Sequence, residues 1–235
     1  MLRAVIVGGG IAGLSTAIAL RRAGHAVVVY ERTQLDNEVG AAINVPPNAS
    51  RFLVGDWGLD PARSRFVRAT RLTWHDPVTA APLSGATLSH ARNAERFGAD
   101  LWLAHRVDLH ASLRRLATEP GAGPGVPVVP YPGSKVVGYD PHVPSITLAS
   151  GEVVEADVVI AADGVHSTAS SFVLGYTNHP VTPSHYNYCY RFLIPASVLE
   201  ADPKTRFWNE GTDGRTRIFA DNEGQRRLVA YVCRE

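Results

Sequence analysis

The sequence has little cysteine, a nearly balanced charge and no long apolar run, and each shortage narrows what the protein can be. Its two cysteines, Cys189 and Cys233, lie far apart and form neither a C-x-x-C motif nor a histidine–cysteine ligand pattern. That argues against a disulfide framework, a zinc site and a dithiol redox enzyme, so no metal is expected. A formal net charge of +1 over 235 residues provides no general attraction for nucleic acid. No apolar run reaches membrane-spanning length. We therefore expect a cytoplasmic chain without a nucleic-acid partner or a membrane span.

The opening stretch has the pattern of a dinucleotide-binding turn. An apolar run, residues 5–7, is followed by Gly8, Gly10 and Gly13 and then by a helix pattern to about Ala23. In the spacing G-x-G-x-x-G, the first glycine permits the turn, the second lets the backbone approach a pyrophosphate, and the third lets helix and strand pack closely. The amino end of the helix then favours phosphate. Three glycines inside the apolar run argue against a signal-peptide core in residues 1–20.

An acidic residue follows the next predicted strand. Residues 25–30 form an apolar run that ends in Glu31, whose carboxylate can accept hydrogen bonds from an adenosine ribose. The alternative is a solvated strand end, and the glycine turn one strand earlier favours the ribose role.

Further along the chain, the sequence predicts two more helices, a short helical piece near residues 197–200, and several strands. One helix starts near Pro47 and Asn48 and continues to Val54, and a second ends at about Thr118. A β-meander is predicted from the strands 126–131, 135–139 and 145–148. The apolar strand 156–162 has the composition of a strand buried on both faces, as in the centre of a parallel sheet. Other predicted strands are 68–76, 86–90, the aromatic stretch 186–195, and a hairpin of 215–220 with 227–233.

Four segments together resemble the FAD-dependent aromatic hydroxylases, the single-component group that includes salicylate hydroxylase and p-hydroxybenzoate hydroxylase. They are Gly8–Gly13 with Glu31-Arg32, the run from Gly40-Ala41-Ala42-Ile43 to Pro47-Asn48-Ala49, His105-Arg106-Val107-Asp108-Leu109, and Ala162-Asp163-Gly164-Val165-His166-Ser167. The glycine fingerprint is shared by all Rossmann-like proteins, whereas the combination of all four is specific. The aromatic stretch 188–195 is similar to fungal members of the salicylate-hydroxylase branch.

The resemblance implies the fold class α/β: a glutathione-reductase-like FAD-binding domain, with a Rossmann-type parallel sheet and a β-meander, and an inserted β-sheet substrate domain. Residues 1–66 and 100–175 would form the FAD-binding domain, and residues 67–99 and 176–235 an incomplete substrate domain. FAD would be the cofactor and NAD(P)H a co-substrate. The implied cofactor-binding residues are Gly8, Gly10, Gly13, Glu31, Arg32, Ala42, Arg106, Asp163 and Gly164.

The activity that the resemblance implies is hydroxylation of a phenolic or salicylate-like ring with O2, through a flavin C4a-hydroperoxide. The flavin performs the redox chemistry, so neither a nucleophilic triad nor a metal is needed. Arg191 could anchor a phenolate or carboxylate, or it is a surface arginine on a strand. Tyr231 and Tyr190 could hydrogen-bond a substrate oxygen, or they are core tyrosines.

Two departures from the family pattern leave alternatives open. Ser170 stands where the family carries an arginine after the Asp-Gly motif, and no Gly-Asp motif follows at the distance where the family has one for the flavin ribityl chain. We therefore expect a truncated chain with an exposed apolar patch, which binds FAD weakly or not at all, hydroxylates poorly, and self-associates unless a partner covers the gap. One alternative is a catalytically incompetent FAD-binding-like fragment with a binding role or none. A second is an NAD-dependent dehydrogenase, against which the β-meander argues.

Overall fold

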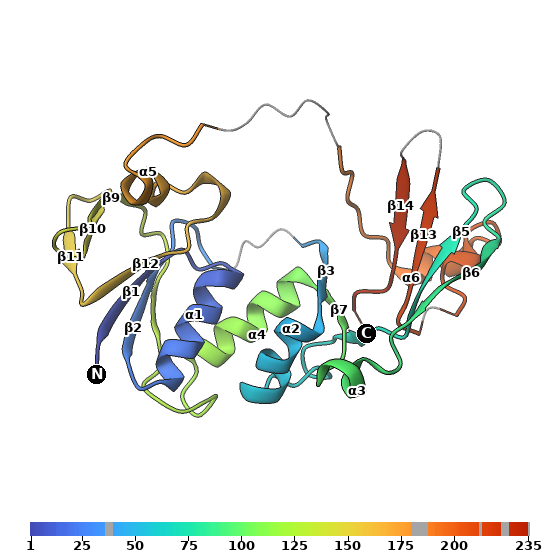
Figure 1. Cartoon of the computed structure of the whole chain (residues 1–235), viewed down its shortest axis with the longest axis horizontal. Helices are drawn as coiled ribbons and strands as arrows, with labels where there is room; N and C mark the ends of the chain where they lie inside the picture. Colours follow the sequence, from blue (N-terminus) through green and yellow to red (C-terminus); the bar gives the residue numbers. More distant parts are fainter. Residues whose placement is uncertain (36–39, 180–187, 212, 222–225, 235) are drawn as a thin grey trace. The chain divides into compact units, whose positions relative to one another are not determined.

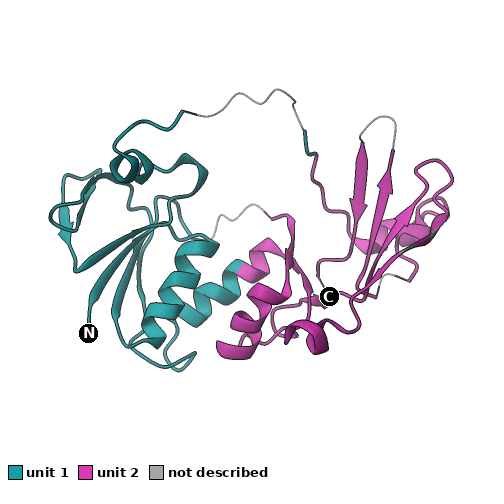
Figure 2. Ribbon diagram, in the orientation of Figure 1, with its two compact units in different colours: residues 1–39, 110–189 teal, residues 40–109, 190–235 magenta. Residues whose placement is uncertain are grey.

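A computed structural model gives the fold of the chain (Figure 1) and describes residues 1–35, 40–179, 188–211, 213–221 and 226–234. The chain divides into two compact units, each made of two stretches of sequence (Figure 2). Unit 1 comprises residues 1–39 and 110–189, and unit 2 comprises residues 40–109 and 190–235. Within the described residues, no helix is both long and apolar enough to cross a membrane.

Unit 1 is built on a four-stranded parallel sheet. Its strand order is β12 (Val158–Ala161), β1 (Arg3–Val7), β2 (Ala26–Tyr30) and β8 (Val129–Tyr131). The β-branched residues of β1 and β2 favour strands, and four of the five residues of β1 are buried. The sheet therefore centres on the run that precedes the glycines.

The two faces of this sheet are covered differently. Successive side chains of a strand point to opposite faces, so Val5 and Val7 share one face. They pack there against Val136, Ile146 and Leu148, which belong to an antiparallel meander. The meander consists of β9 (Val136–Asp140), β10 (Ser145–Leu148) and β11 (Val153–Glu155).

The helix α1 (Ile11–Arg22) packs against β1 and β2, and the helix α4 (Arg106–Thr118) is tied to it by a buried arginine. Arg21 is only 1% exposed. Its guanidinium donates to the carbonyl oxygens of Leu116 and Ala117, both at 2.9 Å. These carbonyls lie in the last turn of α4, where the helix dipole favours a cation. Arg21 therefore fixes the end of α4 against α1.

Two predictions about this sheet are wrong. Residues 126–131 were expected in the meander, but β8 pairs in parallel with β2. The reason is that the chain returns to the sheet through α4, and a helical crossover yields a parallel neighbour. The strand at 156–162 was expected to be buried on both faces. Among the described residues β12 has β1 as its one neighbour, so its side chains are half-buried or exposed.

Beyond β12, unit 1 contains two short helical segments. A single 3-10 turn (Gly164–His166) directly follows the Asp163 position, and α5 (Ala169–Leu174) comes next. Val165 on the turn and Val173 on α5 are 93% and 80% exposed.

Unit 2 contains two sheets. The smaller is antiparallel and consists of β3 (Ala42–Val45), β7 (Trp102–His105) and β4 (Val67–Arg68). The larger has the order β14 (Arg227–Ala230), β13 (Arg215–Ala220), β5 (Arg71–His75) and β6 (Pro82–Ser89), in which β13 and β5 are parallel. Its helical segments are α2 (Pro47–Ser50), a π-helical turn (Arg51–Asp56), α3 (Asn93–Phe97), α6 (Ala196–Ala201) and a 3-10 turn (Arg206–Trp208).

The hairpin of β13 and β14 is confirmed, although β14 ends at Ala230, before the predicted end at Cys233. The aromatic strand is wrong for the part that can be described. Residues 188–195 are irregular, and residues 186–187 lie outside the described residues. Tyr188, Tyr190 and Phe192 are 79%, 89% and 68% exposed, so the alternating side chains find no apolar face to pack on. A strand also needs a neighbour for its hydrogen bonds, and this segment pairs with none of the described strands.

A parallel sheet with a meander on one face, followed by a second β-rich unit, is the architecture that the sequence predicts. The division into an FAD-binding and a substrate domain is a statement about function. It stays a prediction, and the boundaries of the two compact units differ from it at residues 40–66, 100–109 and 176–189.

Candidate functional site

The glycine turn after β1 has the geometry that its sequence predicts. Gly8 has φ +108°, and a Cβ there would come within 2.3 Å of the Ala162 carbonyl oxygen. A Cβ on Gly13 would meet the Gly8 carbonyl oxygen at 1.9 Å. A Cβ on Gly10, in contrast, would have no atom within 4 Å. Two glycines therefore allow close packing within the protein, and the third exposes backbone to open space where a ligand can approach.

Gly10 is also the N-cap residue, directly before the first residue of α1. It provides no capping side chain, and the first helical hydrogen bond runs from the Leu14 N–H to the Gly10 carbonyl at 2.9 Å. The N–H groups of the first turn of a helix have no acceptor within the helix, and the helix dipole makes this end positive. The turn and the helix end thus offer hydrogen-bond donors to a phosphate, and the residues present fit a dinucleotide such as FAD.

Glu31 is oriented by the glycine turn itself. One carboxylate oxygen accepts a hydrogen bond from the Gly9 N–H at 2.7 Å, and the other accepts from the N–H and the hydroxyl of Thr33, both at 2.8 Å. Partial burial raises the pKa of Glu31, but these hydrogen bonds and the charge of Arg32 outweigh it, so the pKa is lowered. The carboxylate is therefore ionised at neutral pH, and its oxygens retain lone pairs for further donors.

Sequence reasoning missed His110. Its Nε2 lies 2.8 Å from the Gly9 carbonyl oxygen, and the side chain is only 3% exposed. Because a carbonyl only accepts, the Nε2 must carry the proton of this bond. Gly9 is thus held through its N–H by Glu31 and through its carbonyl by His110, which lies 101 residues away. In the sequence, the sole sign of this role is a histidine one helical turn after Arg106.

Asp163 is occupied by contacts within unit 1. Its Oδ2 accepts from the N–H of Thr168 at 2.8 Å and from the Tyr139 hydroxyl at 3.3 Å. Burial raises the pKa of Asp163, but hydrogen bonds from Ser167, Ala169 and Thr168 outweigh it and lower the pKa. Burial, with the nearby Asp163 charge, raises the pKa of Tyr139. Asp163 therefore organises the turn before α5, while Gly164, next to it, has φ +81°.

Two further predicted cofactor-binding residues, Ala42 and Arg106, lie in unit 2. Ala42 pairs with His105 across β3 and β7, and the Arg106 N–H donates to the Ala41 carbonyl at 2.9 Å. A Cβ on Gly40 would come within 2.3 Å of the His105 ring. The small residues at 40–42 therefore pack closely against the start of α4, which is a reason for glycine within the protein. Arg32, the remaining predicted residue, is exposed.

Asp108 in the His105–Leu109 motif also has a structural role. It is 6% exposed and forms ion pairs with Arg65 and with Arg234, whose Nε lies 2.6 Å from its Oδ2. A buried carboxylate is stable when it is paired and hydrogen-bonded in this way. Asp108 thus joins the first turn of α4 to Arg65, which lies 43 positions before it, and to Arg234, which lies 126 positions after it.

The two predicted catalytic residues lie in unit 2. Tyr231 follows β14 and packs on a buried cluster of Val67, Ala69 and Leu103. Burial raises the pKa of Tyr231, the neighbouring Cys233 adds to the rise, and the charge of Arg191 opposes it. Arg191 is exposed and irregular rather than on a strand. The two side chains are therefore close enough to interact electrostatically, and Tyr231 is partly a core residue.

Among the described residues, no three histidine, cysteine, aspartate or glutamate side chains come together as metal ligands. The predicted residues divide between the units, with the glycines, Glu31, Arg32, Asp163 and Gly164 in unit 1 and Ala42, Arg106, Arg191 and Tyr231 in unit 2.

A glycine turn between a parallel strand and a helix, with a carboxylate after the next strand, defines a dinucleotide-binding fold of the flavoprotein type. Comparison with known proteins agrees: residues 3–42 match a family described as FAD dependent oxidoreductase.

The similarity extends over nearly the whole chain to FAD-dependent monooxygenases. The chain is 50% identical over 234 residues to the FAD-dependent monooxygenase cfoG of Aspergillus candidus, covering 99% of this chain and 53% of that protein. It is 31% identical over 245 residues to hispidin-3-hydroxylase of Neonothopanus nambi, covering 99% of this chain and 56% of that protein. The chain thus spans about half the length of these relatives.

A solved structure shows the same fold. HpxO of Klebsiella pneumoniae, complexed with FAD and uric acid, matches with a TM-score of 0.69 and 22% identity, over 98% of this chain and 53% of that chain. The predicted resemblance to FAD-dependent hydroxylases, the predicted fold class and FAD as the cofactor of the similar proteins are therefore confirmed. These similarities also disfavour the NAD-dependent dehydrogenase.

Proposed function

We propose that this chain serves an FAD-dependent monooxygenase reaction that hydroxylates a phenolic or salicylate-like aromatic ring with NAD(P)H and O2. The observation that carries the proposal is the glycine turn, in which Glu31 and His110 hold Gly9 while the space beside Gly10 is open. Bound FAD would supply the redox chemistry by the oxygen-transfer route that the resemblance implies.

The residues have separate proposed tasks. Gly8, Gly10 and Gly13 shape the turn for the pyrophosphate, and Glu31 accepts from the ribose hydroxyls. Further contacts to FAD are assigned to Arg32, Ala42, Arg106, Asp163 and Gly164. Arg191 holds the anionic group of the substrate, and Tyr231 hydrogen-bonds a substrate oxygen. The proposed FAD-binding domain comprises residues 1–66 and 100–175, and the proposed substrate domain comprises residues 67–99 and 176–235.

A second proposal is a catalytically incompetent FAD-binding-like fragment with a binding role or none, which binds FAD weakly or not at all. It is favoured by the exposed apolar side chains of unit 1, such as Val165 and Val173, which are 93% and 80% exposed. On this proposal the 235-residue chain self-associates through exposed apolar side chains. The expected location in both cases is the cytoplasm.

An FAD titration of the purified chain distinguishes the proposals. Isothermal titration measures the affinity, the visible absorption spectrum reports bound oxidised flavin, and NADPH oxidation with and without salicylate reports turnover. Tight FAD binding with salicylate-stimulated oxidation supports the monooxygenase. Weak or absent FAD binding without stimulated oxidation supports the fragment.

A further inference from the structure

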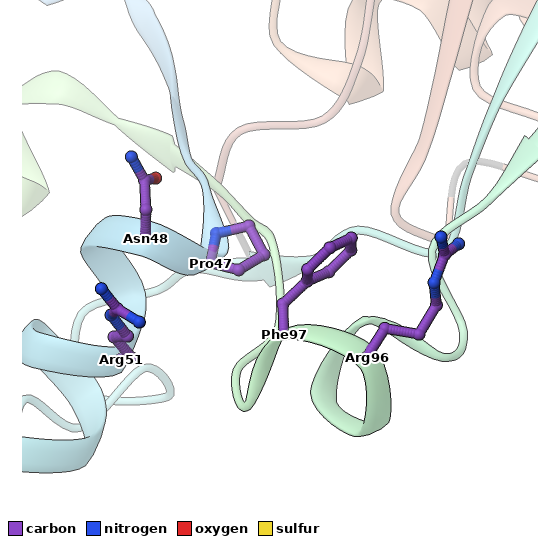
Figure 3. A pocket seen from close by; sticks show the side chains of 5 residues that line it. All are labelled: Pro47, Asn48, Arg51, Arg96 and Phe97. Atoms are coloured by element: carbon purple, nitrogen blue, oxygen red, sulfur yellow. The ribbon is translucent and has the colours of Figure 1, made fainter.

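Unit 2 contains a hollow of about 510 Å³ whose lining includes none of the proposed cofactor-binding or catalytic residues. It is lined by Pro47, Asn48, Arg51, Arg96 and Phe97, which come from α2, the π-helical turn after it, and α3. Figure 3 shows the rings of Pro47 and Phe97 between Arg51 on one side and Arg96 on the other. Hollows of this volume hold small organic molecules.

The two arginines give the hollow an uncompensated positive charge. Within the described part of the chain, neither Arg51 nor Arg96 forms an ion pair. Glu95 lies next to Arg96 in the sequence but pairs with Arg92, their nearest atoms being 2.5 Å apart. Each free guanidinium instead lies near an aromatic ring, Arg51 at 5.0 Å from the Phe52 centroid and Arg96 at 5.2 Å from the Phe97 centroid. Their N–H donors remain available to an oxyanion.

The same hollow has an apolar surface that suits a flat ring. Phe97 is 52% exposed, and Pro47 is half-buried beside it. A large aromatic side chain in this position can stack on a planar ligand, and the guanidinium of Arg96 can extend the stack. Asn48 adds an amide that both donates and accepts hydrogen bonds.

We propose that this hollow binds a small organic anion that has a flat ring and a phosphate or carboxylate group. The guanidinium fork matches both oxyanions in a bidentate manner, and the Pro47–Phe97 surface takes the ring. Such an anion can be a nucleotide or an aromatic acid. The proposal does not depend on FAD, because none of the five residues belongs to the glycine turn or contacts Glu31.

The affinity should be modest and sensitive to salt. Both arginines are exposed, and exposed ion pairs are weak because water and salt screen them. Removing one guanidinium is therefore expected to weaken binding about fivefold, and removing both about twentyfold or more.

In the test, the purified chain is titrated at low ionic strength with two matched pairs of probes. Binding of each probe is measured by ligand-observed NMR. AMP is compared with adenosine, and salicylate with salicyl alcohol, so that each anion has a neutral analogue. All titrations use the Glu31→Ala background, in which binding of a nucleotide at the glycine turn is weakened. Arg51→Gln and Arg96→Gln remove the charges, and Arg63→Gln removes an exposed arginine of the same unit that lies outside the hollow.

We expect one or both anions to bind at least about tenfold more tightly than the neutral analogue, with binding weakened by Arg51→Gln and Arg96→Gln but not by Arg63→Gln. AMP as the tighter probe identifies a nucleotide, and salicylate identifies an aromatic acid. Anion binding that is equal in the parent and in the Arg51→Gln/Arg96→Gln double variant overturns the proposal, as does binding of neither anion. These outcomes are independent of whether the chain binds FAD or oxidises NADPH.

Discussion

Gly9 has no side chain of its own, yet two distant side chains fix both polar atoms of its backbone. The Glu31 carboxylate accepts a hydrogen bond from the Gly9 N–H, and the His110 ring donates one to the Gly9 carbonyl. A loop that is held in this way loses less conformational freedom when a phosphate binds, since the ordering has already occurred during folding. Pre-ordering of the glycine turn is therefore a property of these two residues as well as of the glycines.

Glu31→Ala is expected to weaken FAD binding more than any single change in residues 176–235. The variant removes the proposed ribose acceptor and the Gly9 contact together, and a hydrogen bond to a charged group contributes roughly 1.5–3 kcal/mol. Isothermal titration with FAD measures the difference, and Arg227→Gln on exposed β14 is the control. If Glu31→Ala and the parent bind FAD equally, Glu31 does not belong to the site.

His110→Leu is expected to loosen the glycine turn, whereas His110→Gln, which keeps an N–H donor, should restore part of the effect. Loss of the donor leaves the Gly9 carbonyl without its side-chain partner, at a cost of about 1–3 kcal/mol. Hydrogen–deuterium exchange of the peptide covering residues 8–14 reports the turn directly and needs no bound FAD. The role is refuted when exchange in this peptide is as slow in His110→Leu as in the parent.

Arg191→Ala should abolish the stimulation of NADPH oxidation by phenols that carry an ortho carboxylate or carbonyl group, in a protein that shows such stimulation. The guanidinium is exposed and can pair with an anionic substrate. Steady-state oxidation is measured with salicylate and without it, and Arg206→Ala, in the same unit, serves as the control. Undiminished stimulation in Arg191→Ala would make the residue structural.

At the scale of elements, local sequence patterns predicted the strands and helices that depend on neighbouring residues alone. The β1–turn–α1 unit follows from β-branched residues, three glycines and a helix pattern, and it forms as predicted. The placement of β8 and the exposure of β12 depend on which strands become neighbours, and no local pattern specifies that. The aromatic stretch 188–195 has a strand pattern but finds no partner, so propensity alone misassigned it.

The site shows the same division. Residues recognised by spacing, such as Gly8 and Gly13, have the close contacts that their spacing predicts. The contacts of His110, Asp108 and Tyr139 join positions far apart in sequence, and a single sequence does not show which distant positions come into contact. Physical reading of the chain thus finds the motif but not the side chains that support it.

The carboxylate of Asp163, in the turn before α5, should make the free energy of unfolding depend on pH in the acidic range. The pKa of Asp163 is lowered in the folded chain. Its carboxylate therefore stabilises the fold above its unfolded pKa, about 3.9, and this contribution is lost as the pH falls through the lower folded pKa. Asp163→Asn should show a flatter dependence of the unfolding free energy on pH below about 4.

Urea unfolding measured between about pH 2.5 and pH 6 checks this, because the window brackets the unfolded pKa of an aspartate. Glu119→Gln, an exposed residue after α4, controls for the loss of one carboxylate. Parallel pH profiles for the parent and Asp163→Asn would rule the contribution out, whatever the absolute stability of the variant.

At the scale of the whole molecule, exposed apolar side chains gather in the last part of unit 1. Val165, Val173 and Tyr176 are 93%, 80% and 62% exposed, and they lie within 12 positions of one another along and around α5. Scattered exposed apolar residues are ordinary, whereas several on one short segment favour a surface that contacts another molecule. We therefore expect the 235-residue chain to self-associate.

Light scattering tests this over a range of protein concentration from about 1 to 100 μM. Association shifts with concentration by mass action. The paired substitution Val165→Ser and Val173→Ser should reduce the apparent mass at the highest concentration, because it removes apolar area from the contact surface. Val78→Ser, which alters a 90% exposed valine of unit 2, should leave the mass unchanged. A parent chain that stays monomeric throughout the range contradicts the prediction, and association unchanged by the paired substitution would assign the contact to a different surface.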